Sequence, residues 1–161
     1  MTKAPWVEDR QAERLPVPYF HCVFTLPHAL NALVLVNQRP LLTLLWRAAS
    51  QTLLQFGRQN LGGQLGGIHV LHTWDQTLGA HFHVHCLVPG GALADHGTRW
   101  IPTHPRFLFP VHALSTVFRG KFLAVLHSST TMGPLVFPEE TETLATPEGC
   151  RRCIDQLSTK A

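Results

Sequence analysis

The chain has 161 residues, of which 45% are hydrophobic and 14% are charged, which is enough for one compact domain but not for two. Its formal charge of +3 permits nucleic-acid binding without requiring it. The first fifteen residues are charged and no apolar run is long enough to cross a bilayer, so we expect neither a signal peptide nor a membrane span. Four scattered cysteines exclude a disulfide scaffold and favour the cytoplasm.

The first half of the chain predicts a helix, a strand and a longer helix. A short polar helix is expected over 5–15, and the prolines of 15–18 end it because each restricts its neighbour to extended geometry. Residues 19–26 (YFHCVFTL) favour a strand, being rich in aromatic and β-branched side chains. Apolar residues recur at helical spacing over 40–59 and predict an amphipathic helix, which ends before the glycine-rich turn at 61–67.

The second half predicts two further strands and a helix. Strands are expected at 68–74 and 81–88, separated by a short polar loop. The Pro-Gly-Gly that follows is expected to close the second strand, and residues 98–102 (TRWIP) to form a short edge strand. A second amphipathic helix is expected over 111–129.

The histidines are the most informative residues of the sequence. There are eleven, and several cluster between positions 69 and 85. His81, His83 and His85 alternate along a predicted strand, so they share one face while the intervening apolar residues share the other. Such a face either holds a metal ion or forms a solvated or histidine-lined surface.

A third metal ligand can come from the neighbouring strand. If the loop 75–80 is symmetric, Trp74 lies opposite His81 and His72 lies opposite His83, which lets His72, His83 and His85 converge. A register slip of one residue instead places His69 opposite His85 and turns His72 away. His72 and His69 are therefore competing ligands.

Other side chains near this hairpin are further candidates. His81 is expected as a fourth ligand or as a hydrogen-bond partner of the ligands, and Gln76 in the loop is an alternative. Neutral imidazoles bind transition metals well, and three protein ligands leave positions open for a substrate oxygen. The pattern therefore predicts a metal centre that is open to a substrate.

Three segments resemble a known family. YFHCVFTLPHALN (19–31), VLHTWDQTLGAHFHVHCLVPGGAL (70–93) and FRGKFLAVL (118–126) are similar to the catalytic region of two-tyrosine rolling-circle transposases of bacterial insertion sequences, which are HUH endonucleases. The resemblance runs from Gln11 to Leu126. It implies an α+β fold, an antiparallel sheet flanked by helices in a ferredoxin-like or palm-like core, incomplete in this chain.

The resemblance also implies the roles of the histidines. His83 and His85 match the His-hydrophobe-His pair, and relaxases, distant members of the superfamily, carry a further histidine ligand eleven positions earlier, where His72 stands. In such enzymes a divalent ion, usually Mg or Mn, polarises a phosphate of single-stranded DNA at the transposon ends while a tyrosine attacks it. The expected function is strand nicking and joining in DNA transposition.

The sequence departs from the family pattern in its nucleophile and its cysteines. The family's tyrosine pair lies downstream of the histidine strand, whereas Tyr19 is the one tyrosine here, lies upstream and is expected to have a structural role. The family's amino-terminal zinc module has no match, and Cys150 and Cys153 form a lone CxxC. Complete cleavage activity is not expected of this chain alone, so the alternative is a non-catalytic DNA-binding fragment or a transposase remnant.

These patterns predict three regions and a set of DNA contacts. We expect a lead-in helix and linker over 1–18, a partial HUH domain over 19–130 and a weakly structured acidic tail over 131–161, with a helix near 147–157. A full-length transposase, or its missing carboxyl-terminal part, is an expected partner. Basic and aromatic residues could hold the DNA backbone and bases, namely Arg119, Lys121 and Trp74, with Arg99, Arg106 and Trp100 as further candidates.

Overall fold

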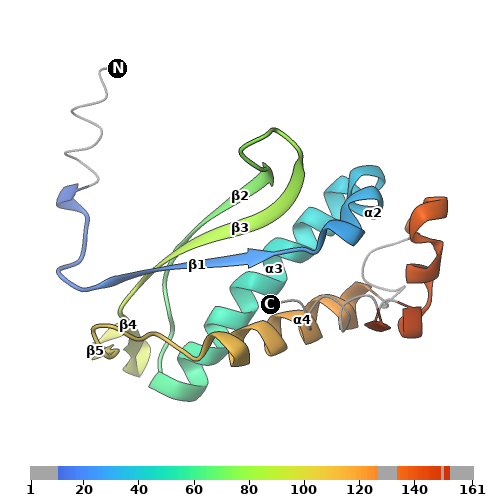
Figure 1. Ribbon diagram of the computed structural model, residues 1–161. Helices are drawn as coiled ribbons and strands as arrows, with labels where there is room; N and C mark the ends of the chain where they lie inside the picture. Colours follow the sequence, from blue (N-terminus) through green and yellow to red (C-terminus); the bar gives the residue numbers. More distant parts are fainter. Residues whose placement is uncertain (1–10, 127–133, 150, 153–161) are drawn as a thin grey trace.

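The computed structural model describes residues 11–126, 134–149, 151 and 152. Its helices and strands, in chain order, are β1 (Tyr19–Thr25), α2 (Asn31–Val36), α3 (Gln38–Phe56), β2 (Ile68–Trp74), β3 (Ala80–Pro89), β4 (Gly91–Ala94), β5 (Arg99–Pro102) and α4 (Val111–Leu126). Figure 1 shows a three-stranded sheet with the long helix α3 behind it and α4 alongside α3. This arrangement confirms the predicted α+β fold.

The sheet has the order β1-β3-β2, and both pairs of neighbouring strands are antiparallel. Strand β3 is therefore central, and its side chains alternate between two faces. Phe82, Val84 and Cys86 are buried on the face that packs against the helices. Burial raises the pKa of the Cys86 thiol to about 12, so this cysteine remains a neutral thiol in the core.

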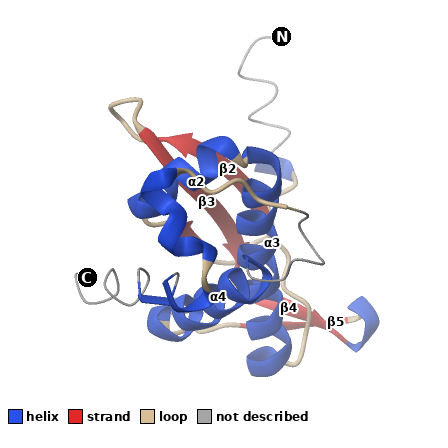
Figure 2. Cartoon of the chain, turned by 90° about the vertical axis from the view of Figure 1, so that its right-hand side faces the viewer, coloured by secondary structure: helices blue, strands red, loops and turns tan. Residues whose placement is uncertain are grey.

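Helix α3 covers the apolar face of the sheet. Figure 2 shows α2 and α3 in front of strands β2 and β3. The predicted helix 40–59 is observed as Gln38–Phe56, followed by a π-helical turn over Gly57–Leu61. Gly62 then has a φ of 64°, in the left-handed region that glycine adopts without strain, and this ends the helical path.

Pro-Gly-Gly closes the strand as predicted, because β3 ends at Pro89 and the chain bends at Gly90. Strand β4 follows and pairs with β5, the expected short strand, in a separate two-stranded ribbon. A Cβ atom on Gly91 would overlap the ring of Trp100 on the facing strand. The glycine therefore allows an indole to pack on the backbone, which a sequence pattern does not reveal.

Helix α2 was not predicted, and it anchors part of the expected acidic tail. Asn37, at the end of α2, donates a hydrogen bond to the carbonyl of Val136 over 2.7 Å and accepts one from its N–H over 2.9 Å. A 3-10 helix at Glu139–Ala145 follows, with Leu144 only 3% exposed. The described part of the tail is thus packed on the core, although the domain boundaries remain a prediction.

Some predictions lie wholly or partly outside the described residues. The helix expected over 5–15 begins in the undescribed residues 1–10, and that expected over 147–157 extends beyond residue 152. Both cysteines of the CxxC pair, Cys150 and Cys153, are also outside them. Within the described part of the chain, no helix has the length and apolar character to cross a membrane.

Candidate metal centre

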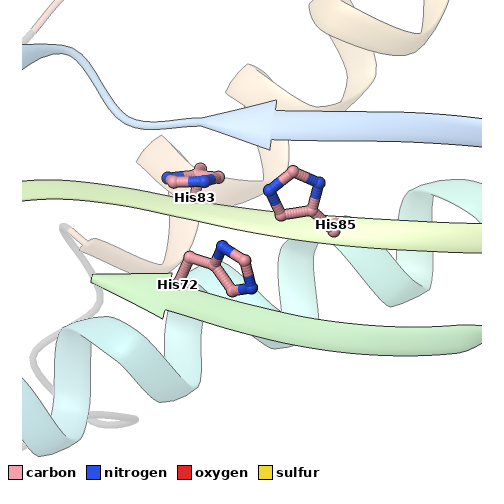
Figure 3. A group of neighbouring side chains, drawn as sticks. All are labelled: His72, His83 and His85. Atoms are coloured by element: carbon pink, nitrogen blue, oxygen red, sulfur yellow. The ribbon is translucent and has the colours of Figure 1, made fainter. Parts of the chain in front are cut away.

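Three histidines converge on the face of the sheet opposite to α3. His83 and His85 alternate along β3, and His72 stands directly opposite His83 on β2. Figure 3 shows the three side chains gathered over the two strands. One ring nitrogen from each lies within 4.8 Å of those of the other two. The ring centroids of His72 and His85 are 4.5 Å apart, and those of His83 and His85 are 4.8 Å apart.

The register agrees with the symmetric-loop prediction at His72 but not at the end of the hairpin. A β-bulge between His72 and Trp74 pairs Trp74 with Ala80, where the prediction placed His81. The turn that follows is held by Asp75, whose Oδ1 accepts hydrogen bonds from backbone N–H groups over 2.8 and 2.9 Å. These local hydrogen bonds favour a turn that is one residue shorter than the symmetric loop 75–80 of the prediction, because Ala80 already belongs to β3.

Hydrogen bonds leave one nitrogen of His83 and one of His85 available to a ligand. His83 Nδ1 lies 3.0 Å from the carbonyl oxygen of His81, which can only accept a hydrogen bond, so His83 carries its proton on Nδ1. His85 Nδ1 lies 2.6 Å from Nε2 of His21. In both rings Nε2 is the atom left for a metal, and the partner of Nδ1 restrains the ring.

His21, from β1, is a residue that the sequence prediction missed. The rings of His21 and His85 are parallel within 5° and their centroids are 4.9 Å apart. That separation matches the short N···N contact plus the two ring radii, so the rings lie edge to edge in one plane. His21 lies on the same face of β1 as Val23, which pairs with His85. The sequence does not reveal that β1 is the neighbour of β3, so it gave no reason to place His21 beside His85.

His81 lies beside the three histidines without belonging to the cluster whose nitrogens converge. Its ring centroid is 4.7 Å from that of His83 and 5.1 Å from that of His28, the residue that begins the 3-10 turn before α2. Burial, followed by the positive charges that His83 and His28 can carry, lowers the pKa of His81. His28 is the second histidine that the sequence prediction missed.

His69, the competing third ligand, lies on the opposite face of the sheet. It pairs with Cys86, and its Nδ1 lies 2.8 Å from Oγ of Ser50 on α3. The Ser50 hydroxyl donates its proton to the carbonyl of Trp46 over 2.9 Å, so it accepts a hydrogen bond from His69. The observed register therefore separates His69 from the other three histidines.

Electrostatics favour a neutral imidazole at His85. Burial, and then possible positive charges on His72, His83 and His21, lower the pKa of His85. A lowered pKa keeps the lone pair of this ring free near neutral pH. Three imidazole nitrogens fit a transition-metal ion, and they leave open positions for oxygen ligands.

The surface around the histidines is open and apolar. Val23, Val70, Leu87 and Ile68 lie on the same face, and their exposed fractions are 46%, 47%, 42% and 65%. Trp74 is 58% exposed, and its ring is parallel to that of His72 within 7° at a centroid distance of 6.4 Å. The histidine face can therefore accept a large ligand with flat apolar groups.

Two other candidates lie away from the centre. Gln76 is exposed in the turn between β2 and β3 and does not belong to the convergent cluster. Tyr19 starts β1, and its hydroxyl accepts a hydrogen bond from the N–H of Leu15 over 3.0 Å. Tyr19 is four residues before Val23, the strand partner of His85. Four residues span about 13 Å along a strand, so the Tyr19 backbone lies well away from His85.

The predicted basic contacts are not brought together with the histidines. Arg119 and Lys121 belong to α4, in the helical layer on the other side of the sheet. Arg99 is in β5, and Arg106 is in the segment before α4. Trp100 packs over a glycine of β4 rather than standing free as a stacking surface. Of the predicted DNA contacts, only Trp74 adjoins the metal centre.

Solved structures of a conjugative relaxase share this fold. The conjugative relaxase TrwC, complexed with a 27-mer DNA comprising the recognition hairpin and the cleavage site, gives a TM-score of 0.55 at 15% identity, over 86% of this chain and 56% of that chain. A metal-bound structure of TrwC with OriT DNA gives 0.51 at 18% identity, over 75% and 46%. At these identities the likeness establishes the fold alone.

The sequence comparisons establish the family. Residues 66–160 match the model of the Y2_Tnp family, described as "Putative transposase". The chain is 41% identical over 159 residues to "Putative transposase y4qJ" of Sinorhizobium fredii (strain NBRC 101917 / NGR234), covering 98% of this chain and 40% of that protein. It is 40% identical over 88 residues to "Transposase for insertion sequence element IS801" of Pseudomonas savastanoi pv. phaseolicola, covering 54% and 21%.

The chain belongs to this transposase family, as its histidine strand and flanking segments predicted. It spans about 40% of the length of y4qJ.

Proposed function

We propose that this chain supplies the metal-binding half of a site that nicks and joins single-stranded DNA during transposition. The observation that carries the proposal is the convergence of His72, His83 and His85 on an open sheet face in a transposase-family chain. A divalent ion bound there would withdraw charge from a phosphate oxygen and orient the phosphodiester. The three histidines hold the ion, and His21 and the His81 carbonyl orient two of their rings.

Of the two metals that the family resemblance implies, we propose Mn²⁺ rather than Mg²⁺. Mg²⁺ prefers oxygen ligands and keeps several waters, whereas imidazole suits transition metals. The centre offers three imidazole nitrogens, and no carboxylate belongs to the cluster within the described residues.

The DNA partner is proposed to be single-stranded DNA at transposon ends. The exposed Trp74 ring, beside His72, offers a face on which a base can stack. The neighbouring exposed apolar side chains, Val23, Val70 and Leu87, suit coverage by a further segment of a full-length transposase. A cytoplasmic location belongs to the same proposal, since transposon DNA is there in bacteria.

The attacking tyrosine is proposed to come from outside the residues of this chain. Tyr19 starts β1 at a distance from the histidines, and its hydroxyl is engaged with Leu15. This observation also favours the second candidate function, a DNA-binding fragment that has no cleavage activity of its own.

Metal binding is the first test of the proposal. Isothermal titration of the purified chain with Mn²⁺ should show one site, and His83→Ala or His85→Ala should each lower the affinity by about 100-fold or more, because each removes a ligand. His112→Ala, an exposed histidine of α4, is the matched control and should leave the affinity unchanged. Unchanged Mn²⁺ affinity in both ligand variants would contradict the site.

Covalent capture of DNA separates the two candidate functions. Labelled single-stranded oligonucleotides that carry a transposon end are incubated with the chain and Mn²⁺, and adducts are counted on a denaturing gel. We expect no adduct from this chain alone and a metal-dependent adduct with a full-length relative. An adduct that disappears in Tyr19→Phe would identify Tyr19 as the nucleophile and overturn its structural role.

A further inference from the structure

A groove runs between α3 and α4 on the outer side of the helical layer. The two helices lie side by side and enclose a cavity of about 430 Å³. Its lining comes from both helices and consists of Arg39, Pro40, Thr43, Leu44, Arg47, Ala48, Gln51, Lys121 and Val125. The groove therefore has an apolar floor and a polar, cationic rim.

Among the described residues, the rim carries positive charge without a local counter-charge. Arg39, Arg47 and Lys121 contribute three cations, and no described acidic side chain lines the groove. Neither α3 nor α4 contains a single Asp or Glu. The sequence has no acidic residue between Glu13 and Asp75, the stretch that contains α3. A low-dielectric floor with unbalanced cations concentrates positive potential and attracts an anion.

The spacing of the rim residues indicates an extended anion. Arg39, Thr43, Arg47 and Gln51 recur every fourth residue, so they form one row along α3. Arg39 and Arg47 are eight residues apart, which is about 12 Å along the helix axis. Because one phosphate group is too small to bridge both guanidinium groups, the row suits a chain of phosphates, to which arginine forms paired hydrogen bonds.

The groove is separate from the metal centre. The buried face of α3, including Leu45 and Ala49, packs toward the sheet face that carries Val84. The histidines of the metal centre lie on the other face of the same sheet. A ligand in the groove is therefore separated from the histidines by the sheet and by the buried side of α3.

We infer that the α3–α4 groove is a second DNA-binding surface, which takes the phosphate backbone of DNA independently of the metal. The inference goes beyond the proposed nicking site, because it assigns DNA binding to the opposite side of the domain. It also gives Lys121 a defined set of neighbours, Arg39 and Arg47, that the sequence did not place with it.

Fluorescence anisotropy in EDTA tests the inference while the metal centre is kept empty of metal. The full chain is titrated with labelled single-stranded DNA and with the matching duplex over a range of salt concentrations. The triple variant Arg39→Gln, Arg47→Gln, Lys121→Gln should bind single-stranded DNA about 10-fold or more weakly at low salt. Its log–log salt slope should fall in magnitude by about 2, because three phosphate contacts are lost.

Matched variants assign the effect to the groove. Arg58→Gln, in the exposed π-helical turn and outside the groove lining, should keep the wild-type affinity and salt slope. Arg39→Lys with Arg47→Lys keeps both charges but removes the paired hydrogen bonds, so it should keep the wild-type salt slope and lose less affinity than the triple variant. Circular dichroism on heating checks that every variant is folded.

The inference is overturned if the triple variant keeps the affinity and salt slope of the wild type. It is overturned likewise if Arg58→Gln weakens DNA binding as much as each groove substitution does on average. It is also overturned if polyglutamate displaces DNA at equal charge concentration, which would assign the groove to an acidic protein segment. The triple groove variant should keep the Mn²⁺ affinity of the wild type, so failure of the metal centre and failure of the groove are distinguishable.

Discussion

The two faces of the central sheet use the same two strands for different purposes. On one face, His83 and His85 from β3 meet His72 from β2 beside exposed apolar residues. On the other face, Val84 of β3 is fully buried under the helices, and His69 of β2 is hydrogen-bonded to α3. A strand alternates its side chains with a period of two, so one segment builds both a core and a site.

The difference between the two faces shows that a histidine's role depends on its neighbours rather than on its place in a cluster. His69 and His72 are three residues apart, but only His72 has other imidazoles within reach. The neighbours of His69 are the Ser50 hydroxyl, which forms a hydrogen bond with its Nδ1, and the ring of Trp46, which packs against it. His69 thus has its contacts within the fold. Four predictions test this difference between the faces.

The largest effect is expected from a change on the core face. Phe82→Ala removes a ring that is 3% exposed and leaves a cavity, so it should lower the free energy of unfolding by about 3–5 kcal/mol. His81→Ala, one residue away on the other face, should cost less than about 1 kcal/mol because its ring is only partly buried. Urea unfolding followed by circular dichroism measures both. Equal costs would mean that the two faces do not differ as described.

The next effect separates His72 from His69 as metal ligands. His72→Ala should lower Mn²⁺ affinity by about 100-fold, since it removes one of three converging nitrogens, whereas His69→Ala should leave it within about twofold. Isothermal titration of the two variants side by side gives the comparison. A larger loss in His69→Ala would show that the strands pair in the alternative register when metal is bound.

A smaller effect is expected at His21, which touches His85 but does not belong to the converging cluster. His21→Phe keeps an aromatic ring and removes the 2.6 Å hydrogen bond to His85, so Mn²⁺ affinity should fall about 10-fold. His21→Gln can still accept a hydrogen bond and should recover part of the affinity. The electronic absorption spectrum of the Co²⁺-loaded protein checks that three histidines still bind. No change in either variant would contradict the orienting role of His21.

The smallest effect concerns the pH dependence of stability through His69. Burial lowers the pKa of His69 below its ordinary value of 6.5. When the pH lies between the lowered pKa of His69 in the folded state and 6.5, its pKa in the unfolded chain, the unfolded chain binds a proton that the folded chain does not. The folded state therefore loses stability as the pH falls through 6.5. His69→Gln removes this difference. The stability advantage of the wild type over His69→Gln, measured by urea unfolding, should therefore be smaller at pH 5.5 than at pH 7.5, and an advantage that grows at low pH would contradict the sign.

Much of the fold could be predicted because it follows local patterns. The alternation in HFHVHC predicted both faces of β3, and the helical spacing of leucines predicted α3 to within three residues at either end. Helix α2 was missed because it is only six residues long and is stabilised by Asn37, whose partner Val136 is 99 residues away. Such a contact has no local sequence signal.

Residue spacing within one or two strands was enough to predict the family and to propose His83 and His85 as a ligand pair with two candidates for a third ligand. Only the fold shows which candidate lies near the pair, since the pairing of β2 with β3 turns His72 toward it and His69 toward α3. It also brought His21 from β1 against His85 and placed Lys121 beside the arginines of α3. Contacts between strands and between helices distant in sequence are set by packing of the whole core, and no local pattern encodes them.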